Sequence, residues 1–526
     1  MPMTWTTRAP VLGRRGAIAT SNFLASESGM NVLRRGGNCV DAVIAAAAVL
    51  NVIEPHCSHL GGDAFMLIWR ATDGKLTAIN SSGIAPHGVS AELFAGGISP
   101  DGFLASTVPG EVAGWDAALR LSGSMPISQL LADAIHYAEE GFPVSRDLAG
   151  ALRAGADRLR QFPSSAAAFL KDGRPYGRGE VLRQPDLAAT LDAIASDGPR
   201  TFYEGETGRR IAEYWQANGG CINERDLAAH RARVLEPISV TYRGWAVHEQ
   251  PPVSQGHILL EALNIVETQD IAAMGVGSAE LLHLCVEANK LAHADRLRFA
   301  ADPAHTEFPA GLLSKGYAAE RARRIDPQRA AAFPPPPGEP PMATDTTYLC
   351  CVDADGNAIS YIQSVFHGFG CGVVAEGTGV LLNNRICGFS LDPTSVNYLL
   401  PGKKPVHTLN TYMVLRDGRP VIVGGTPGGD IQVQTNLQVI TGLVDFGLDP
   451  QRAVEMPRWS RHEGRNVSLE SRFRRATVDG LRDRGHDVTR IGPHAQGGRA
   501  QVIAIAPDGV LTAGSDPRCD GCALAY

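Results

Sequence analysis

A threonine that opens a predicted β-strand directly after a proline-rich stretch has the clearest chemical potential in this sequence. Thr346 follows the segment 329–343, which reads RAAAFPPPPGEPPMA, and begins an alternating β-branched and apolar run to residue 352. Cleavage before Thr346 would place a new α-amino group, with a pKa of ~7.7–8.0, beside the threonine's own hydroxyl. One residue would then supply both a nucleophile and a general base. An ordinary strand threonine fits the same spacing, so both interpretations stand.

Two further features could complete such a site. The turn cluster Asp-Ala-Asp-Gly-Asn at 353–357 separates two β-like runs and indicates a hairpin. This hairpin places Ser364 opposite Thr346 or one residue from it, where its hydroxyl could bond to the nucleophile. Gly428 and Gly429 lie between a predicted strand and a predicted helix, and N–H groups at such a turn can hold an oxyanion. A plain cross-strand pair and a plain tight turn are the alternatives.

Two clusters of potential metal or redox ligands are incomplete. The run Glu-Pro-His-Cys-Ser-His at 54–59 offers two histidines and one cysteine, too few for a closed metal site. Cys519 and Cys522 form a single C-x-x-C pair with no second pair or nearby histidine. The G-x-S-x-G, G-x-x-x-x-G-K-[ST] and H-E-x-x-H motifs are absent from the sequence. We therefore expect no metal and no cofactor.

The elements that must position these residues change in character along the chain. Helical spacing dominates before the proline-rich segment and strands dominate after it, which indicates an α/β or α+β layered fold. The predicted helices span residues 25–35, 41–53, 128–140, 186–196, 207–218, 279–300, 432–446 and 477–484. The predicted strands span residues 64–69, 239–242, 346–352, 358–366, 379–382, 411–415, 420–424, 501–506 and 511–513.

Composition narrows the class of protein. The 526 residues could hold about three domains. The 48 Lys and Arg against 55 Asp and Glu give a net charge of −7 without a basic run, which argues against a nucleic-acid partner. Ten cysteines, mostly in apolar runs, are typical of reduced, buried thiols. The longest apolar run, residues 42–53, is too short for the ~20 residues of a membrane span, and no secretory signal is evident. We expect a soluble, cytoplasmic protein with no membrane partner.

Whole motifs of the sequence resemble those of the γ-glutamyltranspeptidase family. In the second half the matching motifs are DTTY at 345–348, DADGN at 353–357, GFG at 368–370, GTGVLLNN at 377–384 and PGG at 427–429. In the first half they are GGNCVDA at 36–42, EP at 54–55, GG at 61–62, VPGEVAG at 108–114 and EEGFP at 139–143. The end of the chain adds SDPR at 515–518, DG at 520–521 and the final Tyr526. The resemblance covers nearly the whole chain in order.

This resemblance implies an N-terminal nucleophile hydrolase with an α+β fold, a four-layer αββα sandwich, made as a proenzyme. Attack of the Thr346 hydroxyl on the Asp345 carbonyl would cut the chain into a large subunit, residues 1–345, and a small subunit, residues 346–526. The large subunit would be helix-rich and end in the processing segment 329–345. The two subunits would stay together non-covalently, and assembly of these heterodimers into a homo-oligomer is left open.

The resemblance also implies the roles of the catalytic residues. Thr346 would attack an amide substrate and form an acyl-enzyme, which then passes to water or to an acceptor amine. Thr347 and Ser364 match hydroxyl positions that support the nucleophile in the family. Gly428 and Gly429 match its oxyanion hole.

The family's charged substrate contacts are missing here. The arginine that binds the substrate carboxylate in the family aligns with Ser82. The two aspartates that bind the substrate amino group align with Cys387 and Gly388. Loss of one buried charge partner costs ~2–5 kcal/mol, so loss of both kinds of contact disfavours recognition of a γ-glutamyl group.

Other positions of the predicted substrate pocket are changed as well. The family's asparagine is replaced by Phe366, and its serine pair is replaced by His407 and Thr408. Arg385 and His407 are hypothetical replacement contacts for a substrate carboxylate, and a structural role is the alternative for each. Asn384, the second residue of the Asn-Asn pair, is a further predicted contact.

The leading functional hypothesis is therefore an autoprocessed amidohydrolase that acts on a small amide or acyl-amide through a Thr346 acyl-enzyme. It is similar to divergent branches of the family such as cephalosporin acylases and oxamate amidohydrolase. A glutathione hydrolase or γ-glutamyltransferase that uses other contacts is the second hypothesis. An uncleaved homologue that only binds a ligand is the third.

Overall fold

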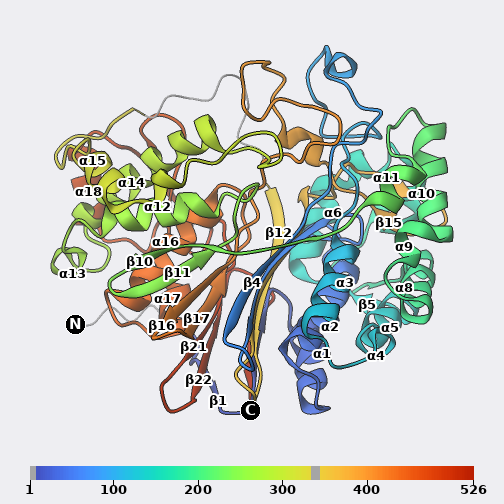
Figure 1. Ribbon diagram of the computed structural model, residues 1–526, viewed down its shortest axis with the longest axis horizontal. Coiled ribbons are helices and arrows are strands. Elements are labelled where there is room, and N and C mark those ends of the chain that lie inside the picture. Colours follow the sequence, from blue (N-terminus) through green and yellow to red (C-terminus); the bar gives the residue numbers. More distant parts are fainter. Residues whose placement is uncertain (1–6, 333–343) are drawn as a thin grey trace.

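The computed structural model describes residues 7–332 and 344–526 and contains two seven-stranded sheets that lie face to face (Figure 1). All neighbouring strands in both sheets are antiparallel. In order, the first sheet contains β23 (Cys522–Ala525), β2 (Ala17–Thr20), β12 (Thr344–Val352), β13 (Ala358–His367), β3 (Asp63–Arg70), β4 (Lys75–Ser81) and β9 (Arg233–Leu235). The second contains β1 (Val11–Gly13), β22 (Leu511–Ser515), β21 (Gln501–Ile505), β17 (Arg419–Gly425), β16 (Tyr412–Arg416), β11 (Trp245–Glu249) and β10 (Ile238–Tyr242).

Helices cover the outer face of each sheet (Figure 1). On the first sheet the main contacts come from α2 (Cys39–Ile53) and α3 (Glu111–Ser122), with α1 (Phe23–Arg34), α5 (Ala132–Glu140), α8 (Pro185–Asp197) and α10 (Glu206–Ala217) around them. On the second sheet they come from α12 (Gly256–Val266), α16 (Ile431–Val444) and α17 (Pro450–Glu455), with α14 (Ala279–Phe299) packed on α12. The order of layers is helix, sheet, sheet, helix, which confirms the expected α+β four-layer αββα sandwich.

The alternation of side chains along the strands builds separate cores from one strand. On β12, Leu349 and Cys351 face the helices of the first layer, while Tyr348 and Cys350 face the second sheet. Both faces are apolar because both are covered. The sheets approach closely at Gly425, where a Cβ would lie 2.4 Å from the Tyr348 ring of the opposite sheet.

Both predicted subunits contribute strands to both sheets. In the first sheet β12 lies between β2 and β13, and β13 in turn pairs with β3. A cut before Thr346 would leave these pairings intact. The length that suggested about three domains therefore forms one interleaved unit rather than a string of separate domains.

The predicted elements agree closely with the observed ones. The predicted helix 128–140 is divided at Leu131 into α4 (Ile127–Leu130) and α5. The predicted strand 379–382 is the short β15 (Val380–Leu381), which pairs with β14 (Val374–Ala375) outside the main sheets. Most of the proline-rich segment, residues 333–343, lies outside the described residues. Within the described part of the chain, no helix is long and apolar enough to cross a membrane.

Candidate active site

The β12–β13 hairpin carries the predicted nucleophile and is fixed at its turn by one carboxylate. Asp353 Oδ1 accepts hydrogen bonds from the backbone N–H groups of Asp355 and Asn357, both at 3.0 Å. Asp353 Oδ2 accepts a bond from the Cys39 N–H at the first turn of α2, at 3.0 Å. A negative charge is favoured at a helix N-terminus, so this contact locks the hairpin to the buried helix.

Thr346 lies at an irregularity in this hairpin. Thr347 pairs with Gln363 and Asp345 pairs with Phe366, so the register shifts by one residue at Thr346. A β-bulge of this kind redirects a side chain, and bulges are frequent beside active sites. The extra residue is on β13, where Ser364 and Val365 together lie opposite Thr346, as the turn predicted for Ser364.

A chain of hydroxyl hydrogen bonds connects the predicted nucleophile to the bond that it would cut. Thr346 Oγ1 donates to Ser364 Oγ at 3.1 Å, and Ser364 Oγ donates to the Asp345 carbonyl oxygen at 2.8 Å. Ser364 Oγ also accepts the Phe366 N–H at 2.8 Å. Thr346 and Ser364 are both buried. Ser364 therefore polarises the carbonyl that precedes Thr346 while holding the Thr346 hydroxyl beside it.

Thr347 faces the opposite side of the strand and joins a second relay. Its hydroxyl bonds to the Ser21 hydroxyl, and Ser21 Oγ donates to Glu54 Oε2 at 2.8 Å. Glu54 is the glutamate of the 54–59 run and is buried. Burial raises the pKa of its carboxyl, while the nearby Arg499 guanidinium and these hydroxyls oppose the shift. The relay holds the Thr347 side of the nucleophile strand in one arrangement.

Arg499 places a positive charge beside the predicted cleavage point. Its guanidinium lies 3.4 Å from the Asp147 carboxylate. Burial raises the pKa of the Asp345 carboxyl and the Arg499 charge opposes that shift. The same positive charge, added to burial, lowers the pKa of His56 to about 3, so this imidazole is neutral at physiological pH.

The Gly428–Gly429 turn joins β17 to α16. Both glycines have positive φ values, +124° and +57°, which favour glycine. The Gly429 carbonyl accepts a bond from Gln255 Nε2 at 3.0 Å, and the same amide donates to the Thr408 carbonyl at 2.8 Å. Neither glycine N–H donates to another described group, so both remain available to an incoming oxygen. The turn is held near Thr346 indirectly, since β17 packs against β12 and β13.

Arg385 lies fully buried in the predicted substrate pocket. Its Nε atom is 3.3 Å from Asp63 Oδ2, and its Cζ atom lies 4.3 Å from the centre of the Phe366 ring. Phe366 has a φ of +83°, a strained value for a side chain of this size. Burial raises the pKa of Asp63 to about 6 and lowers that of Arg385 to about 10. The structure thus brings Arg385 and Phe366 together and adds Asp63.

Ser82 is covered by a lysine that the sequence did not single out. Lys404 Nζ donates to the Ser82 carbonyl and lies 3.4 Å from Ser82 Oγ. Ser82 Oγ itself donates to Asn80 Oδ1 at 2.7 Å. Burial lowers the pKa of Lys404 to about 8. An ammonium group therefore reaches Ser82, the position that the resemblance aligns with the family's arginine.

His407 is fully buried in the same pocket. Its ring packs on Phe65 with centroids 5.0 Å apart, and its Nε2 atom lies 3.6 Å from Asp63 Oδ2. Burial and the nearby Arg385 charge hold its pKa well below the ordinary value, so the ring is neutral. Thr408 is also buried and its Oγ1 atom bonds to no described group.

The other predicted contacts have mainly structural partners. Asn384 Nδ2 donates to the Pro100 carbonyl at 3.0 Å, and Asn384 Oδ1 accepts the His367 N–H at 3.1 Å. Cys387 is partly exposed and its thiol lies 3.7 Å from the Ser99 carbonyl. A Cβ at Gly388 would lie 3.1 Å from Pro405, so an aspartate there would press against this loop.

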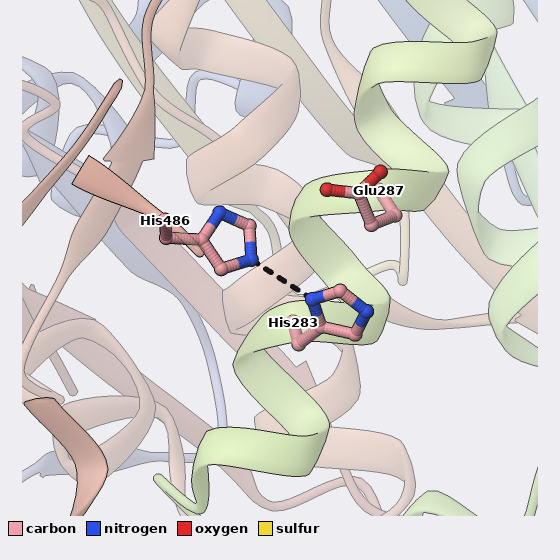
Figure 2. A group of neighbouring side chains, drawn as sticks. All are labelled: His283, Glu287 and His486. Carbon is pink, nitrogen blue, oxygen red and sulfur yellow. Dashed lines mark hydrogen bonds between the residues drawn. The ribbon is translucent and has the colours of Figure 1, made fainter. Parts of the chain in front are cut away.

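One group outside this pocket has a metal-like arrangement (Figure 2). His283 and Glu287 lie one turn apart on α14, and His283 Nδ1 meets His486 Nε2 at 2.8 Å. Glu287 Oε1 is paired with Lys290 Nζ at 2.8 Å, which supplies the positive charge that a metal would otherwise bring. His283 Nε2 bonds to the Asp326 carbonyl and Lys290 Nζ to the Ala331 carbonyl. These contacts explain the group as an anchor for the chain just before residue 333.

Sequence reasoning found the nucleophile strand but missed several neighbours. Ser21, Glu54, Asp63, Lys404 and Arg499 come from five separate segments and have no shared spacing in the sequence. Glu54 belongs to the resemblance motif EP and Asp63 directly follows the motif GG, and this proximity was the available signal. None of the ten cysteines, Cys519 and Cys522 included, is part of a disulfide in the described structure.

Comparison with known proteins agrees with this geometry. The gamma-glutamyltranspeptidase family model matches residues 25–526. The chain is 38% identical to the glutathione hydrolase-like YwrD proenzyme of Bacillus subtilis, over 98% of this chain and 99% of that protein. It is also 38% identical to the oxamate amidohydrolase proenzyme of Klebsiella pneumoniae, over 97% and 98%.

The solved structures extend this agreement to the fold. Cephalosporin acylase from Bacillus halodurans superimposes with a TM-score of 0.94 at 38% identity, covering 100% of this chain and 98% of that one. The four-layer sandwich is thus the N-terminal nucleophile hydrolase fold, and the chain belongs to the gamma-glutamyltranspeptidase family of hydrolases.

Proposed function

We propose that this protein is an autoprocessed N-terminal threonine amidohydrolase that cleaves a small amide. The observation that carries the proposal is the hydrogen-bond chain from the Thr346 hydroxyl through Ser364 to the Asp345 carbonyl. A nucleophile and a polarised carbonyl lie on either side of one peptide bond, which is the arrangement that self-cleavage needs.

The processing step is an internal acyl transfer. Thr346 Oγ1 loses its proton and bonds to the Asp345 carbonyl carbon, the C–N bond to Thr346 breaks, and the nitrogen takes up that proton to become a free amine. Water then hydrolyses the resulting ester, which leaves a carboxylate on Asp345 and restores the Thr346 hydroxyl. Ser364 stabilises the oxygen that becomes negative during the attack. Subunits 1–345 and 346–526 stay together through β2, β3, β12 and β13.

The mature site repeats this chemistry on a substrate. The Thr346 amine accepts the hydroxyl proton while Oγ1 attacks the amide carbon. The unengaged N–H groups of Gly428 and Gly429 are suited to the oxyanion. The amine product leaves after it takes a proton, and water releases the acid from the acyl-enzyme.

The pocket supports a substrate other than a γ-glutamyl compound. Cys387 and Gly388 supply no carboxylate to bind a substrate amino group, and Ser82 cannot bind a carboxylate by charge. A small acid amide of the kind named in the oxamate amidohydrolase relative is the favoured class. Glutathione hydrolysis is the second candidate, because several relatives bear that name.

Intact mass of the purified protein tests the proposal. We expect two fragments cut between Asp345 and Thr346, and we expect Thr346→Ala to stay whole and inactive. Thr346→Ser should still be processed, because it keeps the hydroxyl. A wild-type chain that stays uncut would contradict the proposal and favour a homologue that only binds a ligand. Turnover of a γ-glutamyl anilide at ordinary enzymatic rates would favour the glutathione hydrolase candidate instead.

A further inference from the structure

Two buried cations meet beside the nucleophile strand. Arg385 is 0% exposed and Lys404 is 3% exposed. Arg385 Nε lies 3.3 Å from Asp63 Oδ2, and Asp63 Oδ1 accepts the Gly83 N–H at 2.8 Å. Lys404 Nζ donates to the carbonyl of the preceding residue, Ser82, so both cations lie near Asp63. Buried charges are costly unless they are paired, so the partners of each cation decide what this volume can hold.

Arg385 has only part of its hydrogen-bonding capacity in use. Asp63 Oδ2 lies 3.3 Å from its Nε atom, but no described residue accepts a hydrogen bond from Nη1 or Nη2. The planar fork that these two atoms form matches a carboxylate, which accepts two parallel hydrogen bonds. The Phe366 ring lies 4.3 Å from the guanidinium carbon and holds it by a cation–π contact, which takes up none of the N–H donors.

Lys404 has no carboxylate partner of its own. Its Nζ atom donates to the Ser82 carbonyl, and no described carboxylate lies within ion-pairing distance. The nearby Asp302 carboxylate is already paired with Arg233 at 3.4 Å and accepts the Lys404 backbone N–H at 2.9 Å.

The charges of the pocket are therefore unbalanced. Arg385 and Lys404 are two buried cations, and Asp63 is the one described carboxylate that forms an ion pair with either of them, while Asp302 is paired with the partly exposed Arg233. His407 and His230 do not change this balance, because burial holds the pKa of each well below its ordinary value. One further negative charge would neutralise the site.

We propose that Arg385 and Lys404 together bind a carboxylate on the acyl half of the substrate, with Lys404 replacing the charge that the family carries at position 82. This inference rests on the proposed function. The acyl half is assigned because Phe366, which supports Arg385, pairs across the hairpin with Asp345, the residue whose acyl group Thr346 accepts in the precursor. The substrate class is an amide of a short dicarboxylic acid.

Calorimetry of the processed enzyme tests this without relying on turnover. The ligands are oxalate, succinate and glutarate, each compared with its uncharged diamide. We expect at least one dicarboxylate to bind more tightly than its diamide. Lys404→Met and Arg385→Gln should each weaken that binding by about 30-fold or more, since each leaves a buried charge without its partner.

Two variants serve as controls. Lys404→Arg keeps the charge and should bind the dicarboxylate within a few-fold of wild type. Lys403→Met removes a neighbouring ammonium that donates to the Val396 and Tyr398 carbonyls, and should leave binding unchanged. The fragment pattern on a denaturing gel reports whether each variant has folded well enough to process itself.

The outcomes separate the two proposals. If the chain processes but no dicarboxylate binds better than its diamide, this inference fails while the proposed function stands. Unchanged binding by Lys404→Met would also overturn it, and Lys404 would then be only a clamp on the Ser82 loop. A chain that never processes overturns the proposed function and this inference with it.

Discussion

The site has two ends that share strand β13 but are held by different kinds of contact. The nucleophile end contains Thr346 and Ser364, and the charged end contains Arg385 and Lys404. Around Thr346 the groups are hydroxyls and carbonyls, and the hydroxyl of Ser364 uses both its donor and its acceptor capacity within the protein. Around Arg385 the groups are buried charges with unused donors. The nucleophile end is thus complete without a ligand, whereas the charged end is complete only when an anion is present.

This difference explains how one family can keep its chemistry while its substrates change. The hydroxyl network depends on the register of one hairpin, which a single substitution elsewhere does not alter. The charged pocket collects side chains from separate loops, so a charge can be lost at Ser82 and regained at Lys404. Each of the following tests acts on one end and should leave the other intact.

Among variants that keep Thr346, Ser364→Ala should have the largest effect on the rate of self-cleavage. Removal of the donor to the Asp345 carbonyl should slow self-cleavage by about 10²–10³-fold, as for other oxyanion donors. A time course of precursor conversion on a denaturing gel measures this rate. Ser360→Ala is the matched control, because Ser360 lies on the same face of β13 but donates to the Gly424 carbonyl. Equal processing rates in the two variants would remove Ser364 from the mechanism.

Recognition of a substrate carboxylate by the charged end should depend on pH, once the titration of the nucleophile end has been cancelled by taking a ratio. Lys404 loses its proton above its pKa of about 8, so carboxylate recognition should be full below that pH and fall above it. We expect the ratio of kcat/KM for a carboxylate-bearing amide to that for its uncharged analogue to fall about tenfold per pH unit above about 8. The ratio cancels the titration of the Thr346 amine, which acts on both substrates.

None of the charged and titratable groups that face Lys404 titrates near pH 8, so a change in this pH range is assigned to the lysine. These groups are Asp63, Arg385, His407, His230, Asp302 and Arg233. Asp63 has a pKa of about 6 and Arg385 one of about 10, and both histidines stay neutral. Lys404→Arg should flatten the profile, and a wild-type ratio that stays constant from pH 7 to 9 would contradict the role of Lys404.

The same contrast shows how far sequence reasoning reached. Thr346, Ser364 and the glycine turn were predictable because a hairpin turn and a strand–helix junction fix local geometry over short distances. The four-layer fold was predicted from the family resemblance, which rests on motifs that follow one another in the expected order along the chain. Lys404 was not predictable, because its side chain meets Ser82, a residue 322 positions earlier in the chain, only in the folded protein. Ser21 was missed for the same reason, whereas Glu54 was noted in the run 54–59 and in a motif of the resemblance without its partner.

His407 provides the smallest expected effect and the sharpest test of the comparison. The sequence suggested it as a carboxylate contact alongside Arg385, but its buried ring is neutral and lies 3.6 Å from the Asp63 carboxylate. A neutral hydrogen bond contributes about 0.5–1.5 kcal/mol, so His407→Ala should lower kcat/KM for a carboxylate-bearing amide by about tenfold at most. Steady-state kinetics of His407→Ala and Lys404→Met, measured in parallel, compare the two losses of kcat/KM. A loss as large as that of Lys404→Met would make His407 a charge-bearing contact, and no change in KM or kcat would leave it as packing against Phe65.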